Sequence, residues 1–208
     1  MRLIFKKEPL RRLLTWSQGA FLACAVLLLG YCAFAITDAW LFQRRESTEL
    51  ERVLRDRRAV SEVAPVVETG SLIGRMEIPR LLLSVVVVEG VDETTLRRAA
   101  GHIPGTALPG ETGNVGVAGH RDTFFRSLKD LRIKDEVQLS TPQGIFQYEV
   151  VSLKIVKPDN LEVLASSGKN GLTLVTCYPF YFVGPAPKRW IVTAKQVSSQ
   201  ATSSSSVK

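Results

Sequence analysis

The residues of this chain best able to carry out covalent chemistry are a cysteine, a histidine and an arginine. Cys177 comes directly after the run Leu172–Thr176, and His120 comes after the run Val115–Gly119. Each is therefore expected at the end of a strand, where a rigid scaffold can present a reactive side chain. A nucleophilic thiol needs a histidine for proton transfer and a positive charge beside the oxyanion, which Arg189 could supply. The pattern predicts an acyl-transfer site; the alternative is an inert core thiol and a structural histidine.

The cysteine count bears on this choice. Of the three cysteines, Cys24 and Cys32 lie in an apolar N-terminal stretch and only Cys177 lies beyond it. An unpaired thiol in an oxidising compartment is prone to oxidation, so its presence there suggests a catalytic function. Three cysteines make no disulfide framework, and a thiol redox protein would need a resolving cysteine near Cys177.

Short strands must position these residues. From about residue 70 onward, β-branched and apolar runs alternate with glycine and proline. The strand candidates are Leu72–Ile78, Leu81–Val88, Asn114–Ala118, Glu136–Leu139, Phe146–Val156, Leu172–Thr176 and Arg189–Ala194. Asp92–Arg98 predicts a short helix with Asp92 as its N-cap. Roughly seven or eight strands predict an all-β domain, either a closed barrel or a sandwich.

The N-terminal part predicts a membrane anchor. Residues 13–37 contain no charged side chain. As a helix they reach about 37 Å, enough to cross a hydrocarbon layer of about 30 Å. The basic flank before them is expected in the cytoplasm, which places the remainder outside the cell membrane. A cleaved secretory signal is the alternative, because Ala33–Ala35 resembles a cleavage site, and it also predicts export.

The charge distribution supports the same layout. The net charge is +7, from 27 basic and 20 acidic residues, and residues 1–12 carry five basic side chains against one acidic. The rest is nearly neutral and has no basic stripe, which argues against a nucleic-acid-binding function. We divide the chain into a basic cytoplasmic flank (1–12), a signal-anchor helix (13–37), a stalk (38–69), the β domain (70–197) and a serine-rich tail (198–208) expected to be disordered.

Several stretches resemble the sequences of sortases. Leu172–Cys177 followed by Arg189–Val192 resembles the TLxTC…R signature of that family. Asn114–Arg121 is similar to the segment that carries the family's histidine. Gly101–Thr106 resembles the loop before that segment, and Gly74–Pro79 resembles the first strand.

Cys177–Phe180 and Gly119–Phe125 look most like class D sortases, and the whole resemblance spans about residues 70–197. It implies a closed eight-stranded β-barrel with one or two short helices. It also implies a cysteine transpeptidase that uses no cofactor. Such an enzyme cleaves an LPxT-like motif near the C-terminus of a secreted protein through a thioacyl intermediate. It then joins the acyl group to an amine acceptor, either a cell-wall precursor or a pilin lysine, and so attaches proteins to the cell surface.

The resemblance also implies the roles of individual residues. Cys177 would attack the carbonyl after the motif's threonine, and Arg189 would bind that carbonyl and stabilise the oxyanion. His120 would protonate the leaving amine and deprotonate the incoming one. Two further candidates for the substrate site are Thr176, through its backbone or hydroxyl, and Asp122, which could orient His120 or simply cap a turn.

Other residues and activities fit less well. His102 is expected to be structural, in a turn, and Lys188 should face away from the site because side chains alternate along a strand. Asp159 and Glu162 alone make a poor oxygen cage for calcium, so no metal site is predicted. An L,D-transpeptidase would carry its histidine within a few residues before the cysteine, unlike this chain. A barrel that binds peptides without chemistry remains the alternative from another class.

Overall fold

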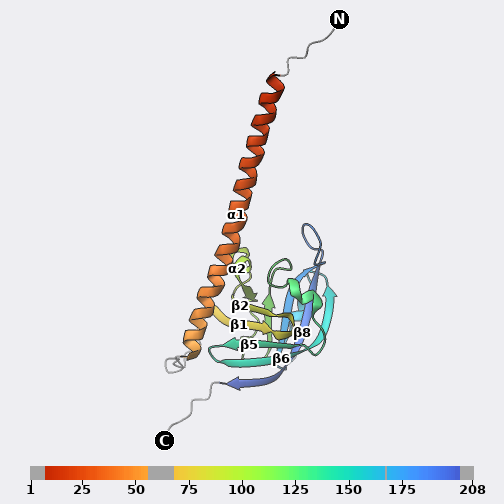
Figure 1. Ribbon diagram of the computed structural model, residues 1–208. Helices are drawn as coiled ribbons and strands as arrows, with labels where there is room; N and C mark the ends of the chain where they lie inside the picture. Colours follow the sequence, from red (N-terminus) through yellow and green to blue (C-terminus); the bar gives the residue numbers. More distant parts are fainter. Residues whose placement is uncertain (1–7, 56–67, 167, 202–208) are drawn as a thin grey trace. The chain divides into compact units, whose positions relative to one another are not determined.

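The computed structural model describes residues 8–55, 68–166 and 168–201, and the chain divides into two compact units, Met1–Leu41 and Phe42–Lys208. The first unit consists of most of the long helix α1 (Glu8–Arg55), drawn in red to orange in Figure 1. Within the described residues, α1 is the one helix long and apolar enough to cross a membrane, over Trp16–Thr48. Its apolar side chains are exposed (Phe21 by 76%), an arrangement consistent with a membrane span.

The helix is longer than the sequence predicted. We expected a spanning segment over 13–37 followed by a stalk, whereas α1 continues without a break to Arg55. The remainder of the predicted stalk up to residue 67 lies outside the described residues. The charged residues of this region are good helix formers, which is consistent with a stalk whose first part is helical.

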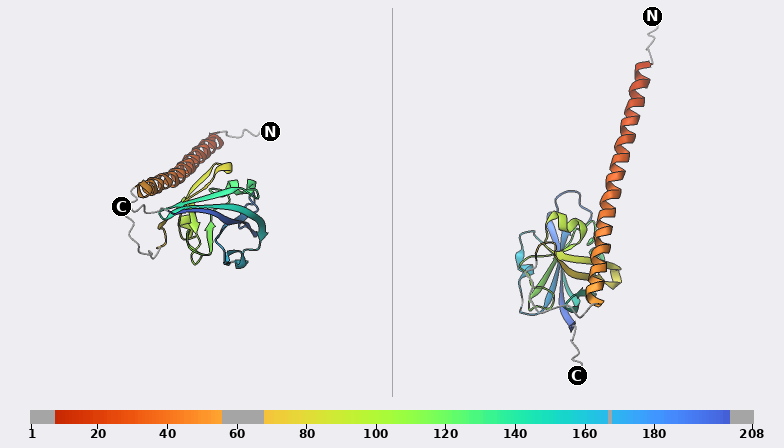
Figure 2. Two further views of the ribbon diagram at one scale, coloured as in Figure 1. Left: turned by 90° about the horizontal axis from the view of Figure 1, so that it is seen from below. Right: turned by 90° about the vertical axis from the view of Figure 1, so that its left-hand side faces the viewer.

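Eight strands form the second unit. They are β1 (Leu72–Ile78), β2 (Leu83–Glu89), β3 (Ala100–His102), β4 (Asn114–Ala118), β5 (Glu136–Thr141), β6 (Gly144–Val156), β7 (Gly171–Tyr178) and β8 (Lys188–Ala201). They close into a barrel in the order β1-β2-β3-β4-β7-β8-β6-β5. Figure 1 and Figure 2 show the strands from three sides. The predicted eight-stranded barrel is therefore confirmed, and the sandwich alternative is wrong.

Four short helices connect the strands: α2 (Glu93–Arg98) and the 3₁₀ turns η1 (Pro79–Leu81), η2 (Arg126–Asp130) and η3 (Leu161–Leu164). The predicted N-cap is confirmed, because the Asp92 side chain accepts a hydrogen bond from Thr95 N at 3.0 Å. Strand β8 continues to Ala201, past the boundary that we drew at residue 197. Residues 202–208 of the predicted tail lie outside the described residues.

Two of the pairings are parallel, and they decide where the strand ends meet. β2 pairs with β3 in parallel, and β4 pairs with β7 in parallel, in a register that sets Ala118 beside Val175. The other neighbours are antiparallel. Because β4 and β7 run the same way, the loops that follow them leave the barrel at the same end.

Side chains alternate between the barrel interior and its outer surface. Along β7, Leu172 and Leu174 are fully buried in the main core. The odd-numbered residues of the strand, Thr173, Val175 and Cys177, therefore face outward, since the side-chain period of a strand is two. The largest fully buried side chains include Tyr148, Phe125, Met76, Ile78, Leu128 and Leu139.

A second, smaller cluster lies on the outer face of β2. Val86 and Val88 pack there with Ala99, and the part of α1 that belongs to the barrel unit covers them with Phe42. The neighbouring Gln43 accepts a hydrogen bond from Val86 N (3.0 Å) and donates one to the carbonyl before Ala99, that of Arg98, at 2.5 Å. The barrel unit therefore includes the helical residues from Phe42 onward.

An ion pair joins η1 to the turn before β5. Arg80 donates from Nε and Nη2 to the two carboxylate oxygens of Asp135, both at 2.6 Å, and Arg132 N donates to Oδ2 at 2.7 Å. The Arg80 guanidinium, against an opposing effect of burial, holds the pKa of Asp135 below its usual value. The carboxylate therefore stabilises the fold above the ordinary carboxyl pKa, and this contribution is lost as the pH falls through the lowered folded-state pKa.

We expect Asp135→Asn to lower the free energy of unfolding by about 1.5–3 kcal/mol at neutral pH, because two charge-assisted hydrogen bonds are lost. Urea unfolding of the wild type and the variant should show this difference shrinking as the solution is made acidic. A difference that stayed constant with pH would mean that the charge of Asp135 contributes nothing.

Candidate active site

Cys177 and Arg189 lie directly opposite each other on adjacent strands. Cys177 is the penultimate residue of β7 and pairs with Arg189 of β8 in the antiparallel register. Opposed residues of an antiparallel pair point to the same face, so both side chains project outward from the barrel. Both are partly exposed. The thiol and the guanidinium are thus presented side by side on one accessible surface.

His120 reaches the same place from β4. It comes two residues after Ala118, the last residue of β4, which pairs with Val175 of β7. Gly119 N donates to the carbonyl of Val175 at 3.1 Å, which extends the pairing up to the residue before His120. Since Cys177 is two residues beyond Val175, the parallel strands bring His120 and Cys177 to the same end of the barrel.

The outer face of β4, β7 and β8 leads away from these three residues. Ala118, Val175 and Ile191 form one row across these three strands, two residues from the thiol and the guanidinium, and Ile191 is only 2% exposed. At its far end, Thr173 Oγ1 donates to Asn114 Oδ1 (3.0 Å) and also lies 3.3 Å from the carbonyl of Val163 in η3. This face is therefore apolar beside Cys177 and is covered by η3 at its far end.

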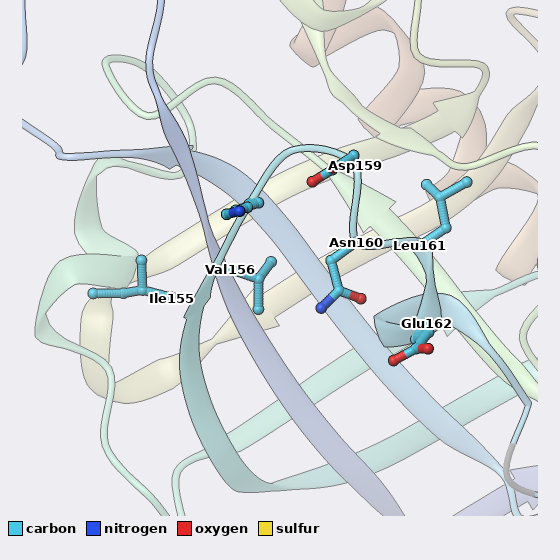
Figure 3. Close-up of a pocket in the computed structure, with 7 residues that line it drawn as sticks. Ile155, Val156, Asp159, Asn160, Leu161 and Glu162 are labelled. Atoms are coloured by element: carbon cyan, nitrogen blue, oxygen red, sulfur yellow. The ribbon is translucent and has the colours of Figure 1, made fainter.

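A cavity of about 580 Å³ lies one strand away, where β6 turns toward η3 (Figure 3). Its lining is formed by Ile155, Val156, Lys157, Asp159, Asn160, Leu161 and Glu162. Val156 pairs with Arg189 across β6 and β8, so the cavity adjoins the strand that carries the arginine. None of the three predicted catalytic residues lines it. The cavity belongs to the surroundings of the site rather than to its reacting centre.

Arg189 is held by its own loop. Its Nη1 donates to the carbonyls of Ala186 (3.2 Å) and Lys188 (3.0 Å). Lys188 itself is exposed and pairs with Tyr178, on the opposite side of the strand from Arg189. The alternation that we used to set Lys188 aside therefore agrees with the observed register.

Aromatic rings fill the inner side of the same strand ends. Tyr178 stacks on Trp190 with ring centroids 6.0 Å apart, and Phe180 packs edge-on against both rings. Tyr178 follows Cys177 and Trp190 follows Arg189, so each ring anchors the backbone next to a predicted catalytic residue. The sequence signal was present in these neighbouring aromatic residues, but their mutual contact depends on the pairing of β7 with β8.

The two weaker candidates take different positions. Thr176 is 2% exposed, and its hydroxyl donates to the carbonyl of Gly119 at 2.7 Å. The hydroxyl thus holds the segment that carries His120, and the predicted contact of Thr176 with a substrate through its backbone stays a prediction. Asp122 is exposed, and within the described part of the chain no hydrogen bond or ion pair joins it to His120.

His102 lies in a buried polar network and not in the turn that we expected. It belongs to β3, is 2% exposed, and its Nδ1 lies 2.5 Å from the Glu89 carboxylate of β2. Its Nε2 lies 3.0 Å from the carbonyl of Ala107 and 3.1 Å from Thr106 Oγ1. No local pattern identifies Glu89 as the partner of His102, because the contact depends on the parallel pairing of β2 with β3.

We expect His102→Ala to lower the free energy of unfolding by about 3 kcal/mol, because it leaves the buried Glu89 carboxylate without its partner. Urea unfolding should show that the double variant Glu89→Ala/His102→Ala loses less than the sum of the single variants. Strictly additive losses would show that the two side chains do not interact.

Metal ligands do not gather around the site. Among the residues that the structure describes, no group of three or more His, Cys, Asp or Glu side chains could hold a metal ion. Asp159 and Glu162 both line the cavity at the end of β6 (Figure 3).

Comparisons with known proteins agree with this geometry. The model of the Sortase domain family matches residues 76–197. Sortase D of Bacillus subtilis (strain 168) is 32% identical over 196 residues, which cover 85% of this chain and 96% of that protein. Sortase A of Bacillus anthracis is 27% identical over 165 residues, 77% of each chain. Among solved structures, a Clostridium perfringens Sortase D5 transpeptidase superposes with a TM-score of 0.64 at 29% identity, covering 74% of this chain and 98% of that one.

Proposed function

Because this chain belongs to the sortase family of cysteine transpeptidases, we propose that it cleaves an LPxT-like sorting motif and transfers the acyl part to an amine. Its substrates would be secreted proteins with that motif near the C-terminus, and the result would be their attachment to the cell surface. The observation that carries the proposal is the opposition of Cys177 and Arg189 on β7 and β8.

In the first half of the proposed reaction, the Cys177 sulfur attacks, as the thiolate, the carbonyl carbon of the motif's threonine. The carbonyl π electrons move to oxygen, and the Arg189 guanidinium stabilises the resulting negative charge. When the C–N bond breaks, His120 gives its proton to the leaving amine. A thioacyl bond then joins the threonine carbonyl to Cys177, and the C-terminal fragment departs.

In the second half, an amine acceptor attacks the thioacyl carbon and gives a proton to His120. The C–S bond breaks, Cys177 is released and a new amide bond is formed, so the enzyme returns to its starting state. The acceptor would be a cell-wall precursor or a pilin lysine. The likeness to class D enzymes favours attachment of selected proteins over pilus polymerisation.

The anchor would place this chemistry outside the cell membrane. The basic residues 1–12 precede the apolar part of α1, and positive flanks remain on the cytoplasmic side. We therefore propose a single-pass protein with a cytoplasmic N-terminus and an extracytoplasmic barrel, where exported substrates are accessible.

The test uses the full-length protein in detergent micelles with a library of LPxTx peptides and a small amine acceptor. Mass spectrometry should detect an acyl adduct on Cys177 and a transpeptidation product for at least one peptide. A folded protein that forms neither adduct nor product with any peptide would instead support a barrel that binds peptides without chemistry.

A further inference from the structure

The loop between β7 and β8, residues 179–187, connects Cys177 to Arg189 and has little structure of its own. Figure 1 shows it as the dark blue loop that extends beyond the strands. Within the described chain, one long backbone hydrogen bond joins two of its residues, from Phe182 N to the Pro179 carbonyl at 3.4 Å. Its apolar tip is exposed, with Val183 at 96%. A loop of this kind needs outside contacts to keep one conformation.

Arg121 provides three of these contacts, and Lys129 Nζ adds a hydrogen bond to the Tyr181 hydroxyl at 2.5 Å. Its Nη1 donates to the carbonyl of Pro179 at 2.9 Å, and its Nη2 donates to the carbonyls of Phe182 (2.7 Å) and Gly184 (3.0 Å). The guanidinium carbon also lies 5.9 Å from the centre of the Phe182 ring. One side chain therefore binds three carbonyl groups spread over six residues of the loop.

Arg121 directly follows His120, so its hydrogen bonds to the loop also restrain the backbone of His120. On the other side of His120, Gly119 donates to Val175 and accepts from the Thr176 hydroxyl. The backbone of His120 is thus fixed to β7 through the residue before it and to the β7–β8 loop through the residue after it.

We propose that Arg121 is a positioning residue that ties the His120 segment to the β7–β8 loop, and so sets the distance of His120 from Cys177 and Arg189. This inference rests on the proposed function for its effect on catalysis, whereas the tie itself depends only on the hydrogen bonds. A misplacement of about 1 Å in a catalytic group can reduce a rate about a hundredfold, so a loosened loop should be visible in kcat.

The chemistry of the contact favours arginine specifically. A planar guanidinium presents five N–H donors in a fixed plane, and here two of its nitrogens serve three carbonyls in different directions. A lysine carries its three donors on a single nitrogen and cannot reproduce this spread. We therefore expect Arg121→Lys to keep the positive charge but to restore the tie only in part.

The experiment compares full-length wild type with Arg121→Gln, Arg121→Lys and the matched control Arg126→Gln, which removes an exposed arginine from the next turn of the same segment. Hydrogen–deuterium exchange should rise in peptides covering 179–187 for Arg121→Gln, less for Arg121→Lys, and not for Arg126→Gln. With the best LPxTx peptide, kcat should fall about 10- to 100-fold in Arg121→Gln while KM changes by less than about threefold.

Unchanged exchange in the loop of Arg121→Gln would overturn the tie, and faster exchange with an unchanged kcat would overturn the positioning role. If Arg121→Gln destabilises the whole barrel, the more conservative variant Arg121→Lys is the test. A wild-type kcat in Arg121→Lys would mean that the positive charge alone is needed and would overturn the role of the three guanidinium hydrogen bonds. If the wild type turns over no peptide, the proposed function fails, but the exchange of residues 179–187 still decides whether Arg121 holds the loop.

Discussion

Replacing Cys177 with alanine should abolish both peptide cleavage and transpeptidation. Loss of a catalytic nucleophile lowers kcat by at least about 10⁴-fold, because no other group takes over covalent catalysis. The side chain faces outward from β7, and its removal leaves no cavity in the core, so the barrel should unfold at an unchanged urea concentration. The measurement is the rate of product formation by mass spectrometry, together with urea unfolding.

The chain contains its own control for this variant. Cys24 and Cys32 lie in the apolar part of α1, and the double variant Cys24→Ala/Cys32→Ala keeps Cys177 as the single thiol. It should retain full activity and form the acyl adduct. Product formation by Cys177→Ala at more than a trace of the wild-type rate would mean that the thiol is not the nucleophile.

Local sequence patterns predicted most of the strands because each strand is itself a local pattern. The β-branched run in Leu83–Glu89 and the apolar run before Cys177 end at glycines, prolines or polar turns, and the observed boundaries of these two strands differ from the predicted ones by at most two residues. The last strand differs more, since it was predicted to end at Ala194 and continues to Ala201. The strand that we missed, Ala100–His102, has three residues, too few to show an alternating pattern. Its existence depends on its neighbours β2 and β4.

Contacts between distant segments could not be predicted in the same way. The opposition of Cys177 and Arg189 requires the exact register of β7 and β8, and the placement of His120 requires the parallel pairing of β4 with β7. Register is a property of two strands together, and a shift by one residue would turn Arg189 to the other face. The family resemblance, not the strand pattern, made these residues the best candidates for one site.

The same reason explains the positions of Thr176 and His102. Thr176 was considered for the substrate site because it precedes Cys177, but alternation along β7 turns it inward, where Gly119 accepts its hydrogen bond. His102 was expected in a turn because of the glycine and proline around it. It instead lies in β3, which pairs with β2 so that its ring contacts Glu89. Both expectations relied on residues adjacent in the sequence, whereas the observed contacts are made with residues of other strands and loops.

Replacing His120 with glutamine should lower kcat/KM about 10²- to 10⁴-fold, the usual contribution of a general acid–base. Glutamine keeps much of the size and hydrogen-bonding capacity of the side chain but cannot exchange a proton, so peptide binding should change little. The pH dependence of kcat/KM should also flatten, because the group that transfers the proton is gone. Steady-state kinetics with the best LPxTx peptide over a range of pH measures both effects.

His102, the other histidine of the chain, provides the matched comparison. It is buried against Glu89 and does not reach the outer face of β7, so His102→Gln should reduce stability but leave kcat within about twofold for the folded fraction. His120→Gln should show the reverse, with a large loss of rate and little loss of stability, because its side chain is partly exposed. If both variants lost activity only in proportion to their loss of folded protein, His120 would have no role in proton transfer.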